Sequence, residues 1–284
     1  MNEVGTPTVS GPLCDARIVN DVCTVALTRR LAAMLDRDPW SIEPGQSLPR
    51  GWHLSMFNLP TRQSALRPDG AGDLGIVIPD LGLSQLLMAG RTIAFGGDIP
   101  IGGNVQRLTR CLSLDQKQGR SGPFSLLSVE HRLTVAADVS PAVIETTRYV
   151  LRNGDAGKDP RSTLTPAPDT AGPILASRTI HPDEALLFRY SAITDNPHRI
   201  HYDYRFATEV EGHPSLVVNG SLPLMFLLEL FREYAAREPV ALDIRNIAPM
   251  YCGRPLSLTI VAADEGFVLR AGDERGILFE ACAQ

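Results

Sequence analysis

The sequence lacks the features of a membrane or secreted protein. No apolar run reaches the 18 or more residues that a membrane-spanning helix needs. The start, MNEVGTPTVSGPLCD, has no basic segment followed by an apolar one, which is the layout of a signal peptide. We therefore expect a soluble, cytoplasmic protein with no membrane partner.

Cysteine is sparse and positive charge is not clustered. The five cysteines are odd in number, widely spaced and without a C-x-x-C pair: Cys14, Cys23, Cys111, Cys252 and Cys282. This spacing favours neither a disulfide framework nor a zinc site, so most of them should be small buried hydrophobes. The net charge of −5 is spread along the chain, whereas nucleic-acid binding needs clustered positive charge. The sequence therefore implies no metal, no redox cofactor and no nucleic-acid partner.

The chain is long enough to bury a substantial core. Its 284 residues, 44% of them apolar, suit one large domain or two of about 130 residues each. The segment RNGDAGKDPRSTLTPAPDTAGP, residues 152–173, is rich in Gly and Pro and has no apolar period, which indicates a linker. We expect a first half over residues 1–151, a linker over 152–177 and a second half over 178–284.

Each half contains strand-like runs, and the second half also contains a strong helix candidate. FSLLSVEHRLTV alternates apolar and polar residues, as a half-buried strand does, and AVIETTRYVLR continues similarly. After the linker, SLPLMFLLELFREYAAR is apolar almost all round through Phe231, which predicts a helix buried on every side. The helix candidate of the first half, RGWHLSMFNL, is weaker. The similar order of GRTIAFGGDIPIGGNVQRLTRCL and LDIRNIAPMYCGRPLSLTIV suggests an internal duplication.

Residues 191–222, SAITDNPHRIHYDYRFATEVEGHPSLVVNGSL, hold three of the six histidines and lead into the buried helix. His201 could act as a base, and Asp195 or Asn196 could orient the water from which it takes a proton. The amide of Gly220 lies where the helix begins, so its N–H can bind an oxyanion. A base, an orienting group and an oxyanion donor are what hydration of an α,β-unsaturated thioester requires.

This stretch resembles the MaoC-like hydratases, whose signature is D-x-N-P-x-H followed by H-G at a helix start. It is closer to a double-hotdog branch that includes mesaconyl-C4-CoA hydratases, itaconyl-CoA hydratases and type 2 hydroxyacyl-thioester dehydratases. That branch carries S-A-L-T-F-N-x-H-R-I-H-Y-D and A-T-x-V-E-G-Y-P-G-L-V-V-H-G-P-L, whereas this chain has SAITDNPHRIHYD and ATEVEGHPSLVVNGSL. The likeness extends over roughly residues 15–284 and implies an α+β double hotdog, in which two antiparallel sheets each wrap a central helix.

The resemblance also implies roles for individual residues. Alignment on HRIHYD assigns the base to His201 and places Asn196, an amide, where general hydratases have a carboxylate. Asp195 either restores a carboxylate to the site or is a turn residue. Gly220 is the implied oxyanion donor. His198, Arg199 and Asn219 are the further candidates for substrate contact, although Arg199 could equally fix the loop.

Several departures from the branch bear on the substrate. Asn219 replaces a usual histidine, the segment SQLLMAG lacks a usual arginine pair, and Gly102-Gly103 replaces Gly-Asp. The missing arginines argue against a dicarboxylyl-CoA, so we expect a paralogue that acts on another acyl thioester, carried by CoA or by a carrier protein. A homodimer is common for this fold. The alternatives are a hotdog thioesterase, a specialised enzyme of secondary metabolism, and a non-catalytic acyl-thioester binding protein.

Overall fold

A large antiparallel sheet dominates the computed structural model of the protein. The structure describes residues 16–284, except for residues 73, 77–80, 82–84, 120–121, 137 and 154–171. Within this part of the chain, the strands are β1 (Arg17–Val22), β2 (Gln85–Phe95), β3 (Asn104–Gly119), β4 (Gly122–Val135), β5 (Val143–Arg152), β6 (Ile174–Ile180), β7 (Ala241–Asn246), β8 (Leu256–Ala262), β9 (Phe267–Asp273) and β10 (Gly276–Ala283).

The two halves of the chain share one sheet. The strand order is β1-β3-β4-β5-β2-β7-β10-β9-β8-β6, and the antiparallel pair of β2 and β7 joins the halves edge to edge. Counted outward from this junction, β5, β4 and β3 of the first half occupy the positions that β10, β9 and β8 occupy in the second half. This mirror order agrees with the suspected duplication. The two antiparallel sheets expected from the sequence form one continuous sheet, because β2 and β7 pair with each other.

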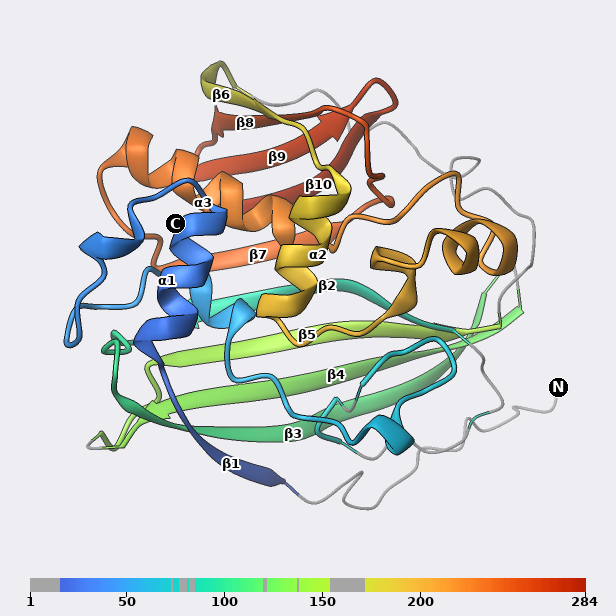
Figure 1. Cartoon of the computed structure of the whole chain (residues 1–284), viewed down its shortest axis with the longest axis horizontal. Helices are drawn as coiled ribbons and strands as arrows, with labels where there is room; N and C mark the ends of the chain where they lie inside the picture. Colours follow the sequence, from blue (N-terminus) through green and yellow to red (C-terminus); the bar gives the residue numbers. More distant parts are fainter. Residues whose placement is uncertain are drawn as a thin grey trace, which may run out of the picture.

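Among the described residues, three α-helices lie on one side of the sheet (Figure 1), namely α1 (Val25–Met34), α2 (Glu184–Ile193) and α3 (Leu222–Ala235). Helix α3 lies against β6, β8 and β9. Every residue of α3 from Leu222 to Phe231 is buried, which confirms the prediction from its apolar sequence. The helix ends at Ala236, which adopts the left-handed conformation with φ of 51°.

Other predictions from sequence need correction. In the first half, RGWHLSMFNL forms a short 3-10 helix over Trp52–Ser55, and the α-helix of that half is α1. Helix α1 carries two arginines within its apolar pattern, which weakened its signal, although Thr24 caps its start by accepting a hydrogen bond from the Leu27 N–H. Strand β6 begins at Ile174, inside the span predicted as linker, and the predicted linker residues 154–171 lie outside the described residues, as does Cys14.

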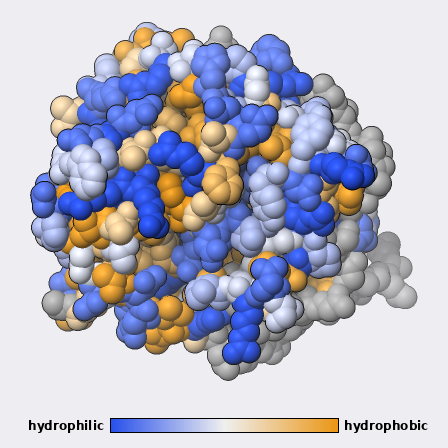
Figure 2. Space-filling view, in the orientation of Figure 1, coloured by the Kyte–Doolittle hydropathy of each residue, from blue (hydrophilic) through white to orange (hydrophobic). Residues whose placement is uncertain are grey.

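The surface mixes polar and apolar residues. Figure 2 shows hydrophilic and hydrophobic residues interspersed over the face of Figure 1. In the described part of the chain, no helix is both long and apolar enough to cross a membrane.

Candidate functional site

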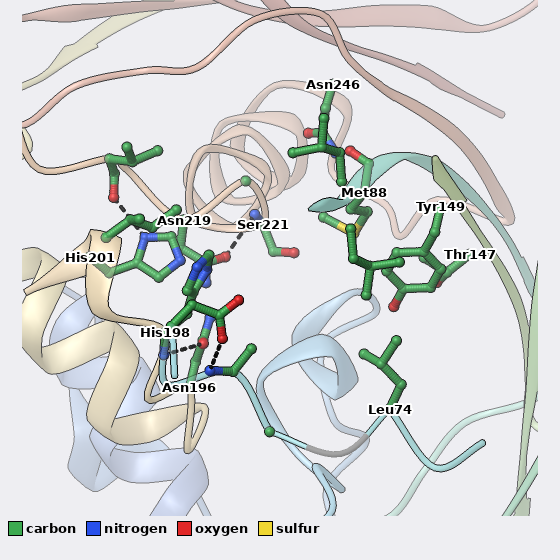
Figure 3. A pocket seen from close by; sticks show the side chains of 18 of the residues that line it. Leu74, Met88, Thr147, Tyr149, Asn196, His198, His201, Asn219, Ser221 and Asn246 are labelled. Atoms are coloured by element: carbon green, nitrogen blue, oxygen red, sulfur yellow. Dashed lines mark hydrogen bonds between the residues drawn. The ribbon is translucent and has the colours of Figure 1, made fainter. Parts of the chain in front are cut away.

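A cleft of about 1640 Å³ lies between the halves of the protein and takes lining residues from both. From the second half it is lined by the loop after α2 and by the start of α3, and from the first half by the faces of β2 to β5 and the loop after Phe57. Figure 3 shows His198, His201 and Asn219 on one side of this space, with Thr147 and Tyr149 across from them. The cleft therefore brings together residues that are far apart in the sequence.

The loop after α2 is fixed by the way that helix ends. Thr194 Oγ1 donates to the carbonyl of Tyr190 at 2.8 Å, and the Asn196 N–H donates to the carbonyl of Ser191 at 2.9 Å. Between them, Asp195 adopts a φ of 46°, in the left-handed region where Asp is better tolerated than most residues. Pro197 then prevents the helix from continuing. The D-N-P sequence is thus the turn that ends α2.

His201 lies at the end of a short 3-10 helix, Arg199–His201, and its side chain is only 6% exposed. Its Nδ1 lies 2.7 Å from the carbonyl oxygen of Val217, to which it must donate, so Nε2 is the nitrogen with a lone pair available for the cleft. Burial lowers the pKa of His201 to about 4, although the bond to Val217 opposes this shift. His201 is therefore a neutral imidazole of defined tautomer near neutral pH, which is the form that a general base needs.

Asn196 and His198 support this arrangement. Asn196 lines the cleft, and its Oδ1 accepts a hydrogen bond from the His198 N–H at 3.2 Å. The rings of His198 and His201 meet edge to face, with centroids 5.6 Å apart. Burial lowers the pKa of His198, and nearby Asp69 opposes that shift. The structure thus places Asn196, His198 and His201 around one part of the cleft.

Asp195 and Arg199 are placed differently from the other candidates. Asp195 lines the cleft but is exposed, and its conformation fits the turn residue that the sequence allowed as an alternative. Arg199 is absent from the cleft lining. Its guanidinium pairs with Asp203 at 2.8 Å and stacks over the Phe206 ring at 4.1 Å, contacts that favour the alternative in which Arg199 fixes the loop.

The start of α3 forms the part of the wall beside His201. Asn219 Oδ1 accepts from the Ser221 N–H at 3.0 Å, and its carbonyl accepts from the Leu222 N–H at 2.9 Å, so Asn219 organises the first turn. Gly220 lies between them and lines the cleft. A Cβ at Gly220 would meet Asn246 Oδ1 at 3.2 Å and the Met88 methyl group at 3.5 Å, so glycine keeps this corner open.

No sequence motif identified Asn246, at the end of β7, as a site residue. Its Nδ2 donates to the Met88 carbonyl at 3.2 Å, while its Oδ1 is buried, lines the cleft and has no hydrogen-bond partner among the described residues. A buried acceptor of this kind is costly unless a ligand or water satisfies it. Asn246 becomes a site residue only because β7 pairs with β2.

The first half contributes contacts to the loop after α2. Asn58 Nδ2 donates to the Thr194 carbonyl at 2.8 Å, and the Arg199 N–H donates to the Asp69 carbonyl at 2.8 Å. Gly70 has a φ of 83°, and a Cβ there would come within 2.1 Å of the Pro197 carbonyl oxygen. Glycine is therefore required at residue 70 for the first half to approach this loop. Within the described residues, no group of three or more His, Cys, Asp or Glu side chains is arranged to hold a metal ion.

The fold is shared with solved structures. One is a conserved hypothetical protein from Mycobacterium tuberculosis that is described as having a double hotdog fold; it matches with a TM-score of 0.60 and 12% identity, covering 99% of this chain and 98% of that one. The large antiparallel sheet with few helices therefore belongs to the hotdog class.

The sequence comparisons then define the family. Residues 51–252 match the family hydroxyacyl-thioester dehydratase type 2. The chain is 33% identical to mesaconyl-C(4)-CoA hydratase from Chloroflexus aurantiacus, over 85% of this chain and 84% of that protein. It is also 33% identical to the mitochondrial hydroxyacyl-thioester dehydratase type 2 of Schizosaccharomyces pombe, over 28% of this chain and 27% of that protein. The chain belongs to the hydroxyacyl-thioester dehydratase type 2 family.

Proposed function

We propose that the protein is a hydro-lyase that adds water to an α,β-unsaturated acyl thioester and catalyses the reverse dehydration. The observation that carries this proposal is His201, a buried neutral imidazole whose Nδ1 is held by Val217 and whose Nε2 is left for the cleft. Membership of a family named for dehydratases and the similarity to a named hydratase support the same reaction class.

His201 would move the proton in both directions. Its Nε2 takes a proton from water, the water oxygen bonds to the β-carbon, and the C=C electrons shift toward the thioester oxygen. The imidazolium then returns its proton to the α-carbon, so the net change is the addition of one water. General acid–base catalysis of this kind contributes roughly 10²- to 10⁴-fold in rate.

The remaining site residues would orient water and stabilise charge. Gly220 and the start of α3 would direct backbone N–H groups at the thioester oxygen as negative charge develops there, which is worth about 3 to 4 kcal/mol per donor. Asn196 uses Oδ1 for the His198 N–H, so its Nδ2 can hold the water. In this assignment Asn219 supports Gly220 through the helix start, and Asp195 acts as a turn residue without a chemical role.

The two halves of the protein would have different roles in the reaction. The second half supplies the reacting groups, and the first half shapes the wall that the acyl group meets, with each half-sheet wrapped around its own helix. The substrate carrier would be CoA or an acyl-carrier protein. A homodimer and a cytoplasmic location are further predictions.

A screen of enoyl thioesters tests the proposal. Purified protein is mixed with crotonyl-, mesaconyl- and itaconyl-CoA, and the loss of enoyl absorbance is followed with and without the protein. We expect loss of absorbance and a hydroxyacyl product for at least one substrate. Release of free CoA thiol without hydration would indicate a thioesterase, and tight binding without conversion would indicate a binding protein, so either result would contradict the proposal.

A further inference from the structure

The core-facing side of β7 carries a polar residue where its pattern predicts an apolar one. Side chains alternate between the two faces of a strand, so Leu242, Ile244 and Asn246 share one face of the sheet. Leu242 and Ile244 are each 2% exposed and belong to the hydrophobic core. Asn246 ends this series and lines the cleft. An amide on a core-facing position needs a hydrogen-bond partner.

The Asn246 amide has a defined orientation. Its Nδ2 donates to the Met88 carbonyl at 3.2 Å, so the nitrogen faces β2 and Oδ1 takes the opposite position. Oδ1 is buried there, and among the described residues none donates to it. An amide oxygen can accept a hydrogen bond but cannot donate one. The cleft therefore presents a buried acceptor whose missing partner must be an N–H or O–H group.

This acceptor lies at the start of α3, on the side away from the proposed base. A Cβ on Gly220 would come within 3.2 Å of Asn246 Oδ1. His201 is held instead by Val217, three residues before Gly220, and Figure 3 shows Asn246 beyond Ser221 as seen from His201. With the thioester oxygen at Gly220 and the β-carbon at His201, the group beside Asn246 lies on the sulfur side of the thioester.

The chemistry of a thioester limits what this donor can be. The C=C bond and the thioester carry no N–H or O–H group, and the hydroxyl formed by hydration is on the β-carbon, beside His201. On the sulfur side, CoA and acyl-carrier proteins present the same pantetheine arm, in which two methylene groups separate the sulfur from an amide N–H. Residues 247–251, which follow Asn246 in the chain, also line the cleft and offer the rest of the arm a wall.

We propose that Asn246 is a substrate-binding residue whose Oδ1 accepts a hydrogen bond from the cysteamine amide N–H of the pantetheine arm. The inference rests on the proposed thioester function of the cleft and deepens it, because it names the recognised part of the substrate. Holding this N–H fixes the thioester carbonyl relative to Gly220 and the β-carbon relative to His201. Such orientation lowers the barrier of the chemical step.

Two ligands that differ in one group test this bond in the wild-type protein. S-butyrylpantetheine carries the amide, whereas an analogue with an ester oxygen in place of the cysteamine N–H cannot donate and places a lone pair against Asn246 Oδ1. Titration calorimetry measures both affinities. The wild-type protein should bind the amide about 10- to 100-fold more tightly, as expected when a buried acceptor loses its donor. Equal affinity for the two ligands would overturn the inference.

Asn246→Ala removes the acceptor, so this variant should bind the amide and the ester within about threefold of each other. Asn20→Ala is the matched control. Asn20 also accepts a side-chain hydrogen bond, from Gln106 at 3.3 Å, but it lies on β1 and is absent from the cleft lining, so its loss should leave the preference for the amide unchanged. An Asn246→Ala variant that keeps the wild-type preference would contradict the proposed contact. A melting curve shows that each variant is folded, and the wild-type comparison needs no variant.

The outcome is separate from that of the enoyl screen. A butyryl group is saturated and cannot be hydrated, so binding is measured without turnover. A preference for the amide in a protein that hydrates no enoyl thioester would reject the hydratase and keep the pantetheine site. Hydration of an enoyl thioester by a protein with no such preference would reject the pantetheine site alone.

Discussion

The protonation state of His201 sets the expected pH dependence. Its pKa is lowered to about 4, so the neutral base is the main form throughout the range from pH 5.5 to 7.5. We expect kcat/KM on the best enoyl thioester to stay within about twofold across this range. A base with the ordinary pKa of about 6.5 would instead lose about tenfold between pH 7.5 and 5.5. A fall of that size, in buffers that leave the protein folded, would contradict the assignment.

Asp195 and Asn196 are neighbours in the chain but lie in different environments. Asp195 is exposed in the turn that ends α2, whereas Asn196 is partly buried and bonds to the His198 N–H. Asp195→Asn keeps the turn and should retain activity within about threefold, since Asn also tolerates left-handed φ. Asn196→Ala should lower kcat by tenfold or more while the melting temperature changes little. The opposite ranking, measured by steady-state rates, would make Asp195 the chemical partner of His201.

At the scale of elements, the start of α3 should be sensitive to small changes in volume. Gly220→Ala adds a methyl group that meets Asn246 Oδ1 at 3.2 Å and narrows the approach to the helix-start amides. We expect kcat/KM to fall by about 10- to 100-fold, since loss of one oxyanion donor costs roughly 10²- to 10³-fold in kcat. The circular dichroism spectrum should not change. Wild-type activity in Gly220→Ala would place the thioester oxygen elsewhere.

The elements also differ in how far sequence could predict them. Helix α3 was predictable because its core face covers nearly the whole circumference, so no polar residue interrupts it before Glu229. Helix α2 was missed even though Asp183 caps its start, with Oδ1 accepting from the Leu186 N–H at 2.8 Å. Its exposed Phe188 contributes an apolar residue on the solvent side, which blurs the helical period.

At the scale of the whole molecule, Glu229 of α3 links the two halves through hydrogen bonds. This buried carboxylate accepts from Trp52 Nε1 of the first half at 2.9 Å and from Arg232 at 2.6 Å. Glu229→Leu would leave both donors without this acceptor, so the free energy of unfolding should fall by about 3 to 5 kcal/mol. Urea unfolding of the variant and the wild type measures this change in free energy. The exposed Glu233→Leu, on the same helix, is the control and should change stability by less than about 1 kcal/mol. Equal effects of the two variants would show that Glu229 does not join the halves.

The residues of the candidate site also differ in whether the sequence alone could identify them. His201, Asn196 and Gly220 lie within 25 residues of one another, so a local motif could identify them. Arg107, Glu145 and Asn246 come from three separate strands and meet only through sheet pairing. The reacting groups were therefore predictable from the chain, while the residues that define the opposite wall were not.

The proposed hydration depends most directly on His201 as the base. We expect His201→Ala to lower kcat for enoyl-thioester hydration by about 10²- to 10⁴-fold, with little effect on thioester binding. The measurement is the initial rate of enoyl absorbance loss for the folded variant beside the wild type, with His181→Ala, an exposed histidine, as the control. A loss of that size confined to His201→Ala would support the account. Near wild-type turnover by His201→Ala would contradict it.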